Sequence, residues 1–293
     1  VEETYKRPFL DRTFRNILSF VLPKPNIFLI LAIASKVIKP FSFLLPQFLK
    51  NSLNLMPNRI PSKKLKSQKV YSPKNNKIVS RVALLTGCVQ RVIAPEINEA
   101  TIRLLNRHNV EVVVMPDVEC CGSLNHHLGK KDLARISFVK NIESWHQEYL
   151  DNGLDAIISN TSGCGTTLKD YGHIFKNDKD FKKKAKKISD LTKDITEYLH
   201  ENLKLNYKNT EEKNYKVAYH SACSMQHGQK IHDQPKELIS KTGSEVLEIP
   251  EGHLCCGSAG TYNILHQKMA KSLLRNKVKN IEKVSPDFIS TGN

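Results

Sequence analysis

The sequence predicts an α/β protein made of two related parallel-sheet Cys-Cys-Gly units that follow a short helical segment. Three observations predict this fold class. Short β-branched runs alternate with helical periods, the alternation occurs twice, and a lone Cys followed by Cys-Cys-Gly recurs at one spacing. The predicted domains are a helical connector at 1–56, a linker at 57–79, a first unit at 80–205 and a second, truncated unit at 214–293.

The amino-terminal connector is apolar and interrupted by prolines. An interior proline removes a backbone donor and clashes with the preceding turn, so short helices are expected. The longest uninterrupted apolar run, 27–34, is far shorter than the roughly 20 residues of a membrane span. We expect a helical layer packed on the neighbouring unit, and the alternative is an amphipathic surface for a membrane or a partner subunit. The interrupting prolines are Pro23, Pro25, Pro40 and Pro46.

Composition excludes several classes of protein. The net charge of +16 comes from 45 Lys and Arg against 29 Asp and Glu, but the Lys-rich runs at 63–69 and 182–187 contain no interleaved aromatic residues that could stack on bases. We therefore expect no nucleic-acid partner. The seven cysteines are odd in number, include two adjacent pairs and follow no secretory signal, which favours reduced thiols in the cytoplasm over a disulfide framework.

The first unit alternates strands and helices. Strands are predicted at 82–86, 110–115 and 156–160, and helices at 97–106 and 131–150. Strands separated by helices of this length imply right-handed crossovers and a parallel sheet that is covered on both faces.

The same order of elements returns after a polar, Lys-rich stretch at 173–214. Strands are predicted there at 216–220, 245–249 and 288–290. The chain therefore contains an internal repeat.

Cysteines follow the predicted strands of both units. A spacing of 31 residues separates Cys88 from Cys120-Cys121-Gly122, and the same spacing separates Cys223 from Cys255-Cys256-Gly257. Ligands of open parallel sheets gather at the carboxyl ends of the strands. We therefore expect a thiol site in each half.

A further cysteine follows the third strand of the first unit. The segment Thr161-Ser162-Gly163-Cys164-Gly165 begins where the strand at 156–160 ends, and its glycines would let the backbone approach a bulky cofactor. Four thiolates are expected to converge in the first unit: Cys88, Cys120, Cys121 and Cys164.

Soft thiolate ligands select iron–sulfur clusters, zinc or Cu(I). Adjacent cysteines fit a single tetrahedral zinc poorly, whereas a cluster offers several irons to neighbouring thiolates. An isolated cysteine is usually a small buried hydrophobe, but two Cys-Cys-Gly elements in register argue against that role. A redox disulfide is not favoured, because no Cys-x-x-Cys motif occurs.

Histidines lie near both sets of cysteines. Histidine can bind a metal, or its charge can tune a cluster, but most histidines in such positions are hydrogen-bonded structural residues. We therefore expect them to surround the site rather than to bind metal. They are His126, His127, His220, His227 and His253.

Five segments, at 85–90, 120–122, 162–172, 220–229 and 255–263, carry a resemblance to a known family. The chain resembles glycolate oxidase iron–sulfur subunits, within a group of Cys-Cys-Gly domain proteins that includes a heterodisulfide reductase component. Lactate-utilisation and anaerobic glycerol-3-phosphate dehydrogenase subunits are in the same group. The stretch Pro8-Phe9-Leu10-Asp11-Arg12 is also similar to the family's helical connector.

The resemblance implies an electron-transfer subunit of an oxidoreductase complex that acts on a 2-hydroxy acid. Electrons would pass from an FAD-containing partner subunit, through iron–sulfur clusters of the 4Fe-4S kind, toward a membrane electron acceptor. This chain would supply no catalytic residue, and it would be cytoplasmic, at the inner face of the membrane. The implied cluster ligands are Cys88, Cys120, Cys121, Cys164, Cys223, Cys255 and Cys256.

The chain departs from the family pattern in three ways. The amino-terminal ferredoxin part is absent, Thr161 stands where a Cys-x-x-Cys pattern has its earlier Cys, and the second unit ends at Asn293 before its equivalent cysteine. The chain is therefore expected to be a fragment, with Thr161, His220 and His227 as neighbours of the site. The alternatives are a docking scaffold without clusters, a zinc-bound module, or the equivalent subunit of a lactate or glycerol-3-phosphate dehydrogenase.

Overall fold

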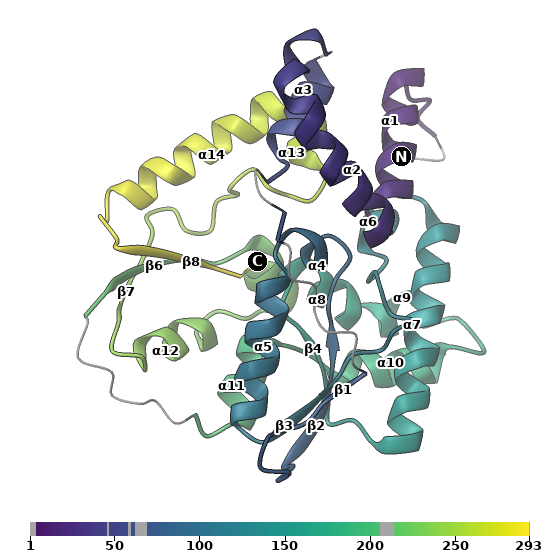
Figure 1. The fold of residues 1–293 in the computed structure, drawn as a ribbon, viewed down its shortest axis with the longest axis vertical. Helices are drawn as coiled ribbons and strands as arrows, with labels where there is room; N and C mark the ends of the chain where they lie inside the picture. The colour runs from purple at the N-terminus through teal and green to yellow at the C-terminus, as the bar shows by residue number, and fades with distance from the viewer. Residues whose placement is uncertain (1–3, 46, 58–59, 62–68, 206–213, 293) are drawn as a thin grey trace. The chain divides into compact units, whose positions relative to one another are not determined.

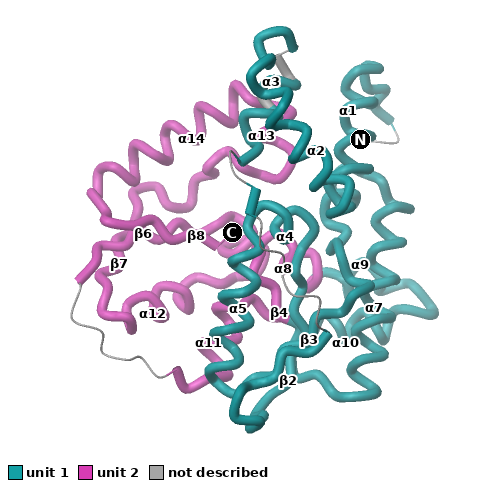
Figure 2. Tube along the Cα trace, viewed as in Figure 1, with its two compact units in different colours: residues 1–157, 170–191 teal, residues 158–169, 192–293 magenta. Residues whose placement is uncertain are grey.

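The computed structural model describes residues 4–45, 47–57, 60–61, 69–205 and 214–292. The chain divides into two compact units, which Figure 2 distinguishes by colour. Unit 1 comprises residues 1–157 and 170–191, and unit 2 comprises residues 158–169 and 192–293. The residues at 158–169 belong to the first sequence repeat, so the compact units and the repeats do not coincide.

Unit 1 contains the amino-terminal helices and most of the first repeat (Figure 1). Its strands are β1 (Val70–Tyr71), β2 (Ser80–Leu85) and β3 (Val110–Val113), and β4 (Ala156–Ser159) begins in it. Its helices are α1 (Phe9–Val21), α2 (Pro25–Ile38), the 3₁₀ helix η1 (Lys39–Leu44), α3 (Gln47–Asn54), α4 (Gln90–Ile93), α5 (Pro95–Arg107), α6 (Ser123–His127), α7 (Lys131–Asn152), α9 (Tyr171–Ile174) and α10 (Lys182–Leu191).

Unit 2 contains the second repeat and the helix that follows β4. Its strands are β5 (Thr192–Asp194), β6 (Lys216–His220), β7 (Glu245–Leu247) and β8 (Phe288–Thr291). Its helices are α8 (Ser162–Lys169), α11 (Ile195–Asn202), the π-helix η2 (Ser224–Gln229), α12 (Gln234–Ser240), α13 (Tyr262–Leu265) and α14 (Gln267–Glu282).

The strand order confirms the predicted repeat. One sheet has the order β1-β3-β2-β4-β5 and the other has the order β7-β6-β8, so β3-β2-β4 of the first repeat corresponds to β7-β6-β8 of the second. β2 pairs with β3 in parallel, and β6 pairs in parallel with both β7 and β8. All residues of β3 and β4 are buried, as expected for parallel strands with both faces covered.

Each repeat fixes the start of its first strand with an aspartate. Asp155 precedes β4 and accepts a hydrogen bond from the backbone N–H of Arg81 at 2.8 Å. Asp287 precedes β8 and accepts one from the backbone N–H of Lys216, also at 2.8 Å. The two halves therefore share a local contact as well as a strand order.

The predicted linker at 57–79 contains a short strand. β1 pairs antiparallel with β3, with Val70 opposite Val113 and Tyr71 opposite Val112. The linker prediction was wrong at these positions, because two β-prone residues between polar segments give no periodic signal. The rest of the predicted linker lies partly outside the described residues.

The polar stretch at 173–214 also contains structure that the sequence did not reveal. α10 buries Ala185 and Ile188 on one face in spite of its many lysines. α11 begins with a capping box, in which the Asp194 side chain accepts from the backbone N–H of Thr196 and Glu197 accepts from that of Asp194. The many lysines of this stretch made the apolar positions of α10 difficult to recognise in the sequence.

The amino-terminal helices belong to unit 1, and they contact its first repeat. α2 contacts α4, and Phe28 and Ala32 of α2 are buried. α2 continues into η1, however, and the segment Pro25–Leu44 contains an 18-residue window that has a mean hydropathy of 1.9 and is 17% buried. By length and composition, this segment could cross a membrane, which corrects the expectation that no segment is long enough. Soluble core helices and signal sequences meet the same criterion, so no span is assigned.

Candidate functional site

Three cysteines of the first repeat lie in unit 1 and form the first thiol set. Cys88 follows β2 and precedes α4, whereas Cys120 and Cys121 lie between β3 and α6. Cys120 and Cys121 are buried, and Cys88 is half-buried. The sequence therefore predicted correctly that these residues follow the first two strands.

The Cys-Cys-Gly turn of the first set requires its glycine. Gly122 has φ of +81°, a conformation that residues with a side chain rarely adopt. A Cβ at this position would lie 2.5 Å from Cε1 of Phe138. The backbone N–H of Gly122 points to Cys120 Sγ at 3.4 Å, so the turn places a hydrogen-bond donor on the sulfur.

Two buried side chains hold the backbone of the cysteine pair. Asn141 of α7 donates from its side-chain amide to the Cys120 carbonyl oxygen at 2.8 Å and to Tyr171 Oη at 3.0 Å. Tyr171 in turn donates to the Cys121 carbonyl oxygen at 2.8 Å. Both consecutive carbonyls are thereby satisfied, which fixes the direction of the two thiols.

The thiols of the first set interact with one another. Hydrogen bonds from Cys121 and then Cys88 lower the pKa of Cys120 to about 4, and they outweigh the opposing effect of burial. The Gly122 N–H acts in the same direction. The set therefore holds a thiolate at neutral pH, and a thiolate is the form that binds metal.

The second thiol set, in unit 2, repeats the same turn. Cys223 follows β6 and caps η2, and Cys255 and Cys256 precede Gly257, which has φ of +85°. The Gly257 N–H points to Cys255 Sγ at 3.3 Å, and a Cβ on Gly257 would lie 2.3 Å from the carbonyl oxygen of Ala270. The two repeats therefore share the hydrogen bond from the glycine N–H to the first cysteine sulfur as well as the sequence Cys-Cys-Gly.

The electrostatics of the second set differ from those of the first. Burial raises the pKa of Cys223, and the neighbouring Cys255 and Cys256 raise it further. A side-chain hydrogen bond with Cys255 is among the causes of this shift, so the Cys223 and Cys255 thiols lie close together. Cys223 is therefore a neutral thiol until a metal displaces its proton.

Cys164 lies on α8 in unit 2, whereas Cys88, Cys120 and Cys121 lie in unit 1. The predicted four-thiol set therefore stays a prediction. Ser162–Lys169 is helical, so the glycines on either side of Cys164 are part of a helix. Gly165 makes room for Gln229 of η2, since a Cβ there would lie 2.9 Å from the Gln229 Nε2.

Two of the residues predicted to surround the site have assigned contacts. His220 Nδ1 lies 3.0 Å from Thr291 Oγ1, and burial and then the Lys277 charge lower the pKa of His220. The Thr161 carbonyl oxygen accepts a hydrogen bond from Ser159 Oγ at 2.9 Å. His227 is exposed on η2. A role for any of them around the site stays a prediction.

The remaining histidines also have their own environments. His126 lies against Phe138, with ring centroids 5.7 Å apart, and both His126 and His127 are exposed at the end of α6. Partial desolvation of the ring and then the charge of His126 lower the pKa of His127. His253, in the loop before the second cysteine pair, is exposed. A neutral imidazole at His127 is consistent with a structural role.

The donor atoms of the two sets fit an iron–sulfur cluster better than a single ion. Among the described residues, no three His, Cys, Asp or Glu side chains are grouped so that they could hold one metal ion. In each set, however, the neighbouring cysteines shift the pKa of one member, Cys120 in the first and Cys223 in the second. A cluster takes such thiolates on separate irons, whereas tetrahedral zinc needs all its ligands around one centre.

Sequence inspection missed three residues that support these sets. Asn141 and Tyr171 hold the first cysteine pair, and Tyr171 lies in a segment that carries the family resemblance without having an assigned role. Lys277 of α14 is 3% exposed and donates to the carbonyl oxygens of Glu251 and Gly252, just before the second pair. A polar residue at a position that an amphipathic helix would bury could have indicated each of these residues. Such residues are common, however, so the pattern alone does not identify a supporting role.

A family model supports the repeat independently. The cysteine-rich domain model named CCG matches residues 82–169 and 217–293. The two matches contain all seven cysteines. Both thiol sets therefore fall within recognised copies of one domain.

Curated relatives extend the similarity beyond the repeats. The chain is 34% identical to the glycolate oxidase iron-sulfur subunit of Escherichia coli (strain K12), over all of this chain and 68% of that protein. It is 30% identical to a "Probable glycolate oxidase iron-sulfur subunit" of Bacillus subtilis (strain 168), over 85% of this chain and 55% of that protein. It is 27% identical to lactate utilization protein A of Anoxybacillus flavithermus, over 71% of this chain and 85% of that protein. The chain therefore belongs to the CCG cysteine-rich domain family, which includes the glycolate oxidase iron–sulfur subunits.

Proposed function

We propose that this chain is the iron–sulfur electron-transfer subunit of a flavin-linked dehydrogenase that oxidises glycolate to glyoxylate. The observation that carries the proposal is the repeated Cys-Cys-Gly turn, in which a glycine N–H points to the first sulfur at 3.4 Å in one copy and 3.3 Å in the other. Two copies of one thiol arrangement favour a chain of redox centres over an isolated structural metal.

Each thiol set has residues suited to holding a cluster, whose bound form would supply reversible one-electron transfer. Asn141 and Tyr171 keep the Cys120-Cys121 backbone fixed. The N–H groups of Gly122 and Gly257 hydrogen-bond to the cysteine sulfurs, an interaction that tunes the reduction potential. The proposed ligands are Cys88, Cys120 and Cys121 in one set and Cys223, Cys255 and Cys256 in the other, with Cys164 as a further candidate.

The relatives' names support the proposed substrate. Two relatives are named as glycolate oxidase iron–sulfur subunits, which favours glycolate, and one is named for lactate utilization, which makes lactate the second candidate. We place oxidation of the hydroxy acid at FAD in a partner subunit. The electrons then pass through this chain to a membrane acceptor.

The amino-terminal helices support a position at the inner face of the membrane, with the rest of the subunit in the cytoplasm. Phe9, Ile30 and Val37 expose large apolar side chains on α1 and α2. Lys24 and Lys36 are also exposed on this segment, and lysines favour an anionic lipid surface. The same surface is suited to a peripheral attachment.

Anaerobic purification of the intact subunit tests the proposal. Iron and sulfide analysis with electron paramagnetic resonance should show bound clusters, and Cys120→Ser and Cys255→Ser should each lower the iron content and the transfer of electrons. Ser258→Ala, which changes an exposed neighbour of the second set, is the matched control.

Two outcomes would contradict the proposal. A folded, intact subunit that binds neither iron nor sulfide would exclude an electron-transfer role. Unchanged turnover and assembly in both cysteine variants would instead support a docking scaffold, and stoichiometric zinc would identify a structural module.

A further inference from the structure

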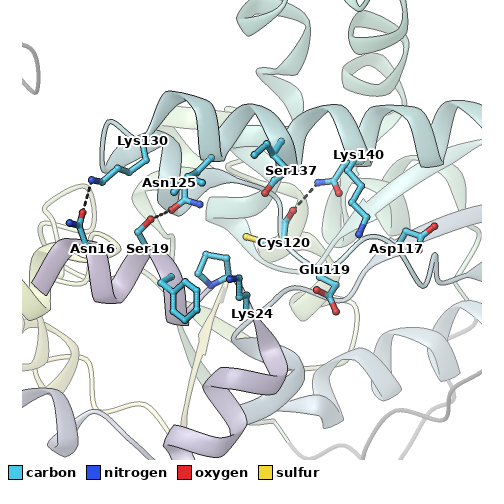
Figure 3. A pocket seen from close by; sticks show the side chains of 15 residues that line it. Asn16, Ser19, Lys24, Asp117, Glu119, Cys120, Asn125, Lys130, Ser137 and Lys140 are labelled. Carbon is cyan, nitrogen blue, oxygen red and sulfur yellow. Dashed lines mark hydrogen bonds between the residues drawn. The ribbon is translucent and has the colours of Figure 1, made fainter. Parts of the chain in front are cut away.

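Unit 1 has a cavity of about 520 Å³ beside the first thiol set (Figure 3). Cys120 is part of its wall, together with residues of α1, the turn between α1 and α2, and α7. Figure 3 shows the Cys120 side chain among those that face the cavity. The cavity therefore brings a bound molecule next to a proposed cluster ligand.

Hydrogen bonds between α1 and the α6–α7 region hold the cavity open. Ser19 Oγ donates to Asn125 Oδ1 at 2.7 Å, and both side chains are buried. Lys130 Nζ donates to Asn16 Oδ1 at 2.6 Å. Figure 3 marks both contacts with dashed lines. Such a preformed cavity binds a ligand without first ordering its own walls.

The walls combine apolar side chains with polar and charged ones, among them the carboxylates of Asp117 and Glu119. Phe20, Leu133 and Ile136 supply apolar surface, and Ser137 and Lys140 supply hydrogen-bond donors. Of the three lysines that line the cavity, Lys130 is bonded to Asn16 and Lys24 lies over the Phe20 ring at 3.7 Å. Among the described residues, Lys140 forms no ion pair, so its ammonium group is available to a ligand's oxygen.

The dimensions and chemistry limit the class of ligand. Cavities of roughly 300–1,000 Å³ take drug-sized molecules, so a two- or three-carbon hydroxy acid would leave most of this one unfilled. Nucleotide cofactors usually place their phosphates against glycine-rich loops and helix N-termini. None of the described residues that line the cavity is a glycine. An apolar ring that carries carbonyl oxygens fits the walls better.

We propose that this cavity binds the head group of a membrane-soluble quinone, which accepts the electrons that leave the first thiol set. The inference rests on the proposed function, because it names the membrane acceptor's class and its site. Phe20 and Ile136 contact the ring, and Ser137 and Lys140 donate hydrogen bonds to its oxygens. Reduction of the quinone to a hydroquinone would take two protons from solvent and two electrons, which a cluster held by the first thiol set would supply one at a time.

Binding of a fluorescent quinone analogue, 2-heptyl-4-hydroxyquinoline N-oxide, to the anaerobically purified intact subunit tests the inference. Saturable quenching of its fluorescence is expected. Ile136→Glu should weaken binding by at least about tenfold, because a carboxylate would be desolvated against the apolar ring. Leu150→Glu is the matched control, since Leu150 and Ile136 are similarly exposed on α7 and Leu150 does not line the cavity.

Iron content and the paramagnetic signal, measured on the same samples, separate this inference from the proposed function. The quinone site would be overturned if a subunit that carries its cluster did not bind the analogue. It would also be overturned if the wild-type and Ile136→Glu subunits bound the analogue equally well. A subunit that lacks iron but binds the analogue with the expected difference between variants would support the site, and the electron-transfer role would fail alone.

Discussion

Asn141 donates a hydrogen bond of 2.8 Å from its side-chain amide to the backbone carbonyl of Cys120. The contact joins α7 to the cysteine pair across 21 residues of chain, and both residues are buried. The position of a redox-active or metal-binding thiol therefore depends on a side chain that has no redox chemistry of its own.

Loss of this support should destabilise unit 1. Asn141→Leu leaves the Cys120 carbonyl without its donor, and Tyr171→Phe does the same to the Cys121 carbonyl, so each should cost about 1–3 kcal/mol of unfolding free energy. Urea denaturation of the metal-free protein measures both. Because Asn141 also donates to Tyr171, the double variant should deviate from additivity by about 0.5 kcal/mol or more. Gln147→Leu, on the exposed face of α7, is the control, and strict additivity would disprove the coupling.

Comparing substitutions at two glycines of unit 2 distinguishes the cost of backbone strain from the cost of a steric clash. Gly243 and Gly257 both have φ of +85°, but a Cβ would meet nothing within 4 Å at Gly243, whereas at Gly257 it would lie 2.3 Å from the Ala270 oxygen. Gly243→Ala should therefore cost about 1–2 kcal/mol from strain alone. Gly257→Ala should cost a further 1–3 kcal/mol or so, since a helix backbone must move. Thermal or urea unfolding measures both, and equal costs would contradict the close packing against α14.

The buried carboxylate Glu148 should make stability depend on pH. Burial raises its pKa, but hydrogen bonds from Arg81 and then Lys69 outweigh this effect and hold the pKa below its ordinary value of 4.5. A lowered folded-state pKa contributes stability above the unfolded-state value, and the contribution is lost as pH falls through the folded-state pKa. At pH 7, Glu148→Gln should therefore cost about 1–3 kcal/mol.

Urea unfolding of wild type and Glu148→Gln across pH 3–7 checks this dependence, and the difference between them should shrink below the ordinary pKa of 4.5. Glu143→Gln, an exposed residue on the same helix, should show no such trend. A difference that stayed constant with pH would mean that the ion pairs are not its source.

The contact between α8 and η2 offers a compensation test within unit 2. A Cβ on Gly165 would lie 2.9 Å from Gln229 Nε2, which donates to the Ser162 carbonyl oxygen at 3.0 Å. Gly165→Ala should therefore displace the amide and cost about 1–3 kcal/mol. Shortening the neighbour in Gly165→Ala/Gln229→Ser should restore part of the loss. If the second substitution only added to the first, the two residues would not be in contact. Equilibrium unfolding of the two variants and of Gln229→Ser alone measures the effect.

Strong periodic patterns made much of the fold predictable. The predicted strand at 216–220 has the bounds of β6, and the helix predicted at 131–150 is α7, which extends to Asn152. The positions of Cys88, Cys120 and Cys121 after their strands were also predictable, because equal spacing in two repeats needs no knowledge of long-range packing, whereas the set of four thiols with Cys164 stays a prediction. Which side chain donates a hydrogen bond to a given backbone carbonyl depends on how each helix is rotated about its axis. The roles of Tyr171 and Asn141 were therefore not predictable from the sequence.

The elements that the sequence did not reveal share one physical cause. α8 contains Gly163 and Gly165, which weaken helical propensity, and it forms because Gln229, Ser224 and their neighbours pack on it. α10 is stabilised by burial of Ala185 and Ile188 within a lysine-rich stretch. In both helices, tertiary contacts supply stability that the apolar pattern of the sequence does not show.

The placement of α8 bears on how the repeat arose and how it can be divided. Ser162 and Thr166 come from the first repeat, yet their hydroxyl groups are bonded to Ser224 of the second. A duplicated module that could fold alone would keep such contacts within its own copy. These contacts join the two copies, so a fragment that begins at the second repeat would leave Ser224 without them. Cutting the chain before α8 would preserve that interface.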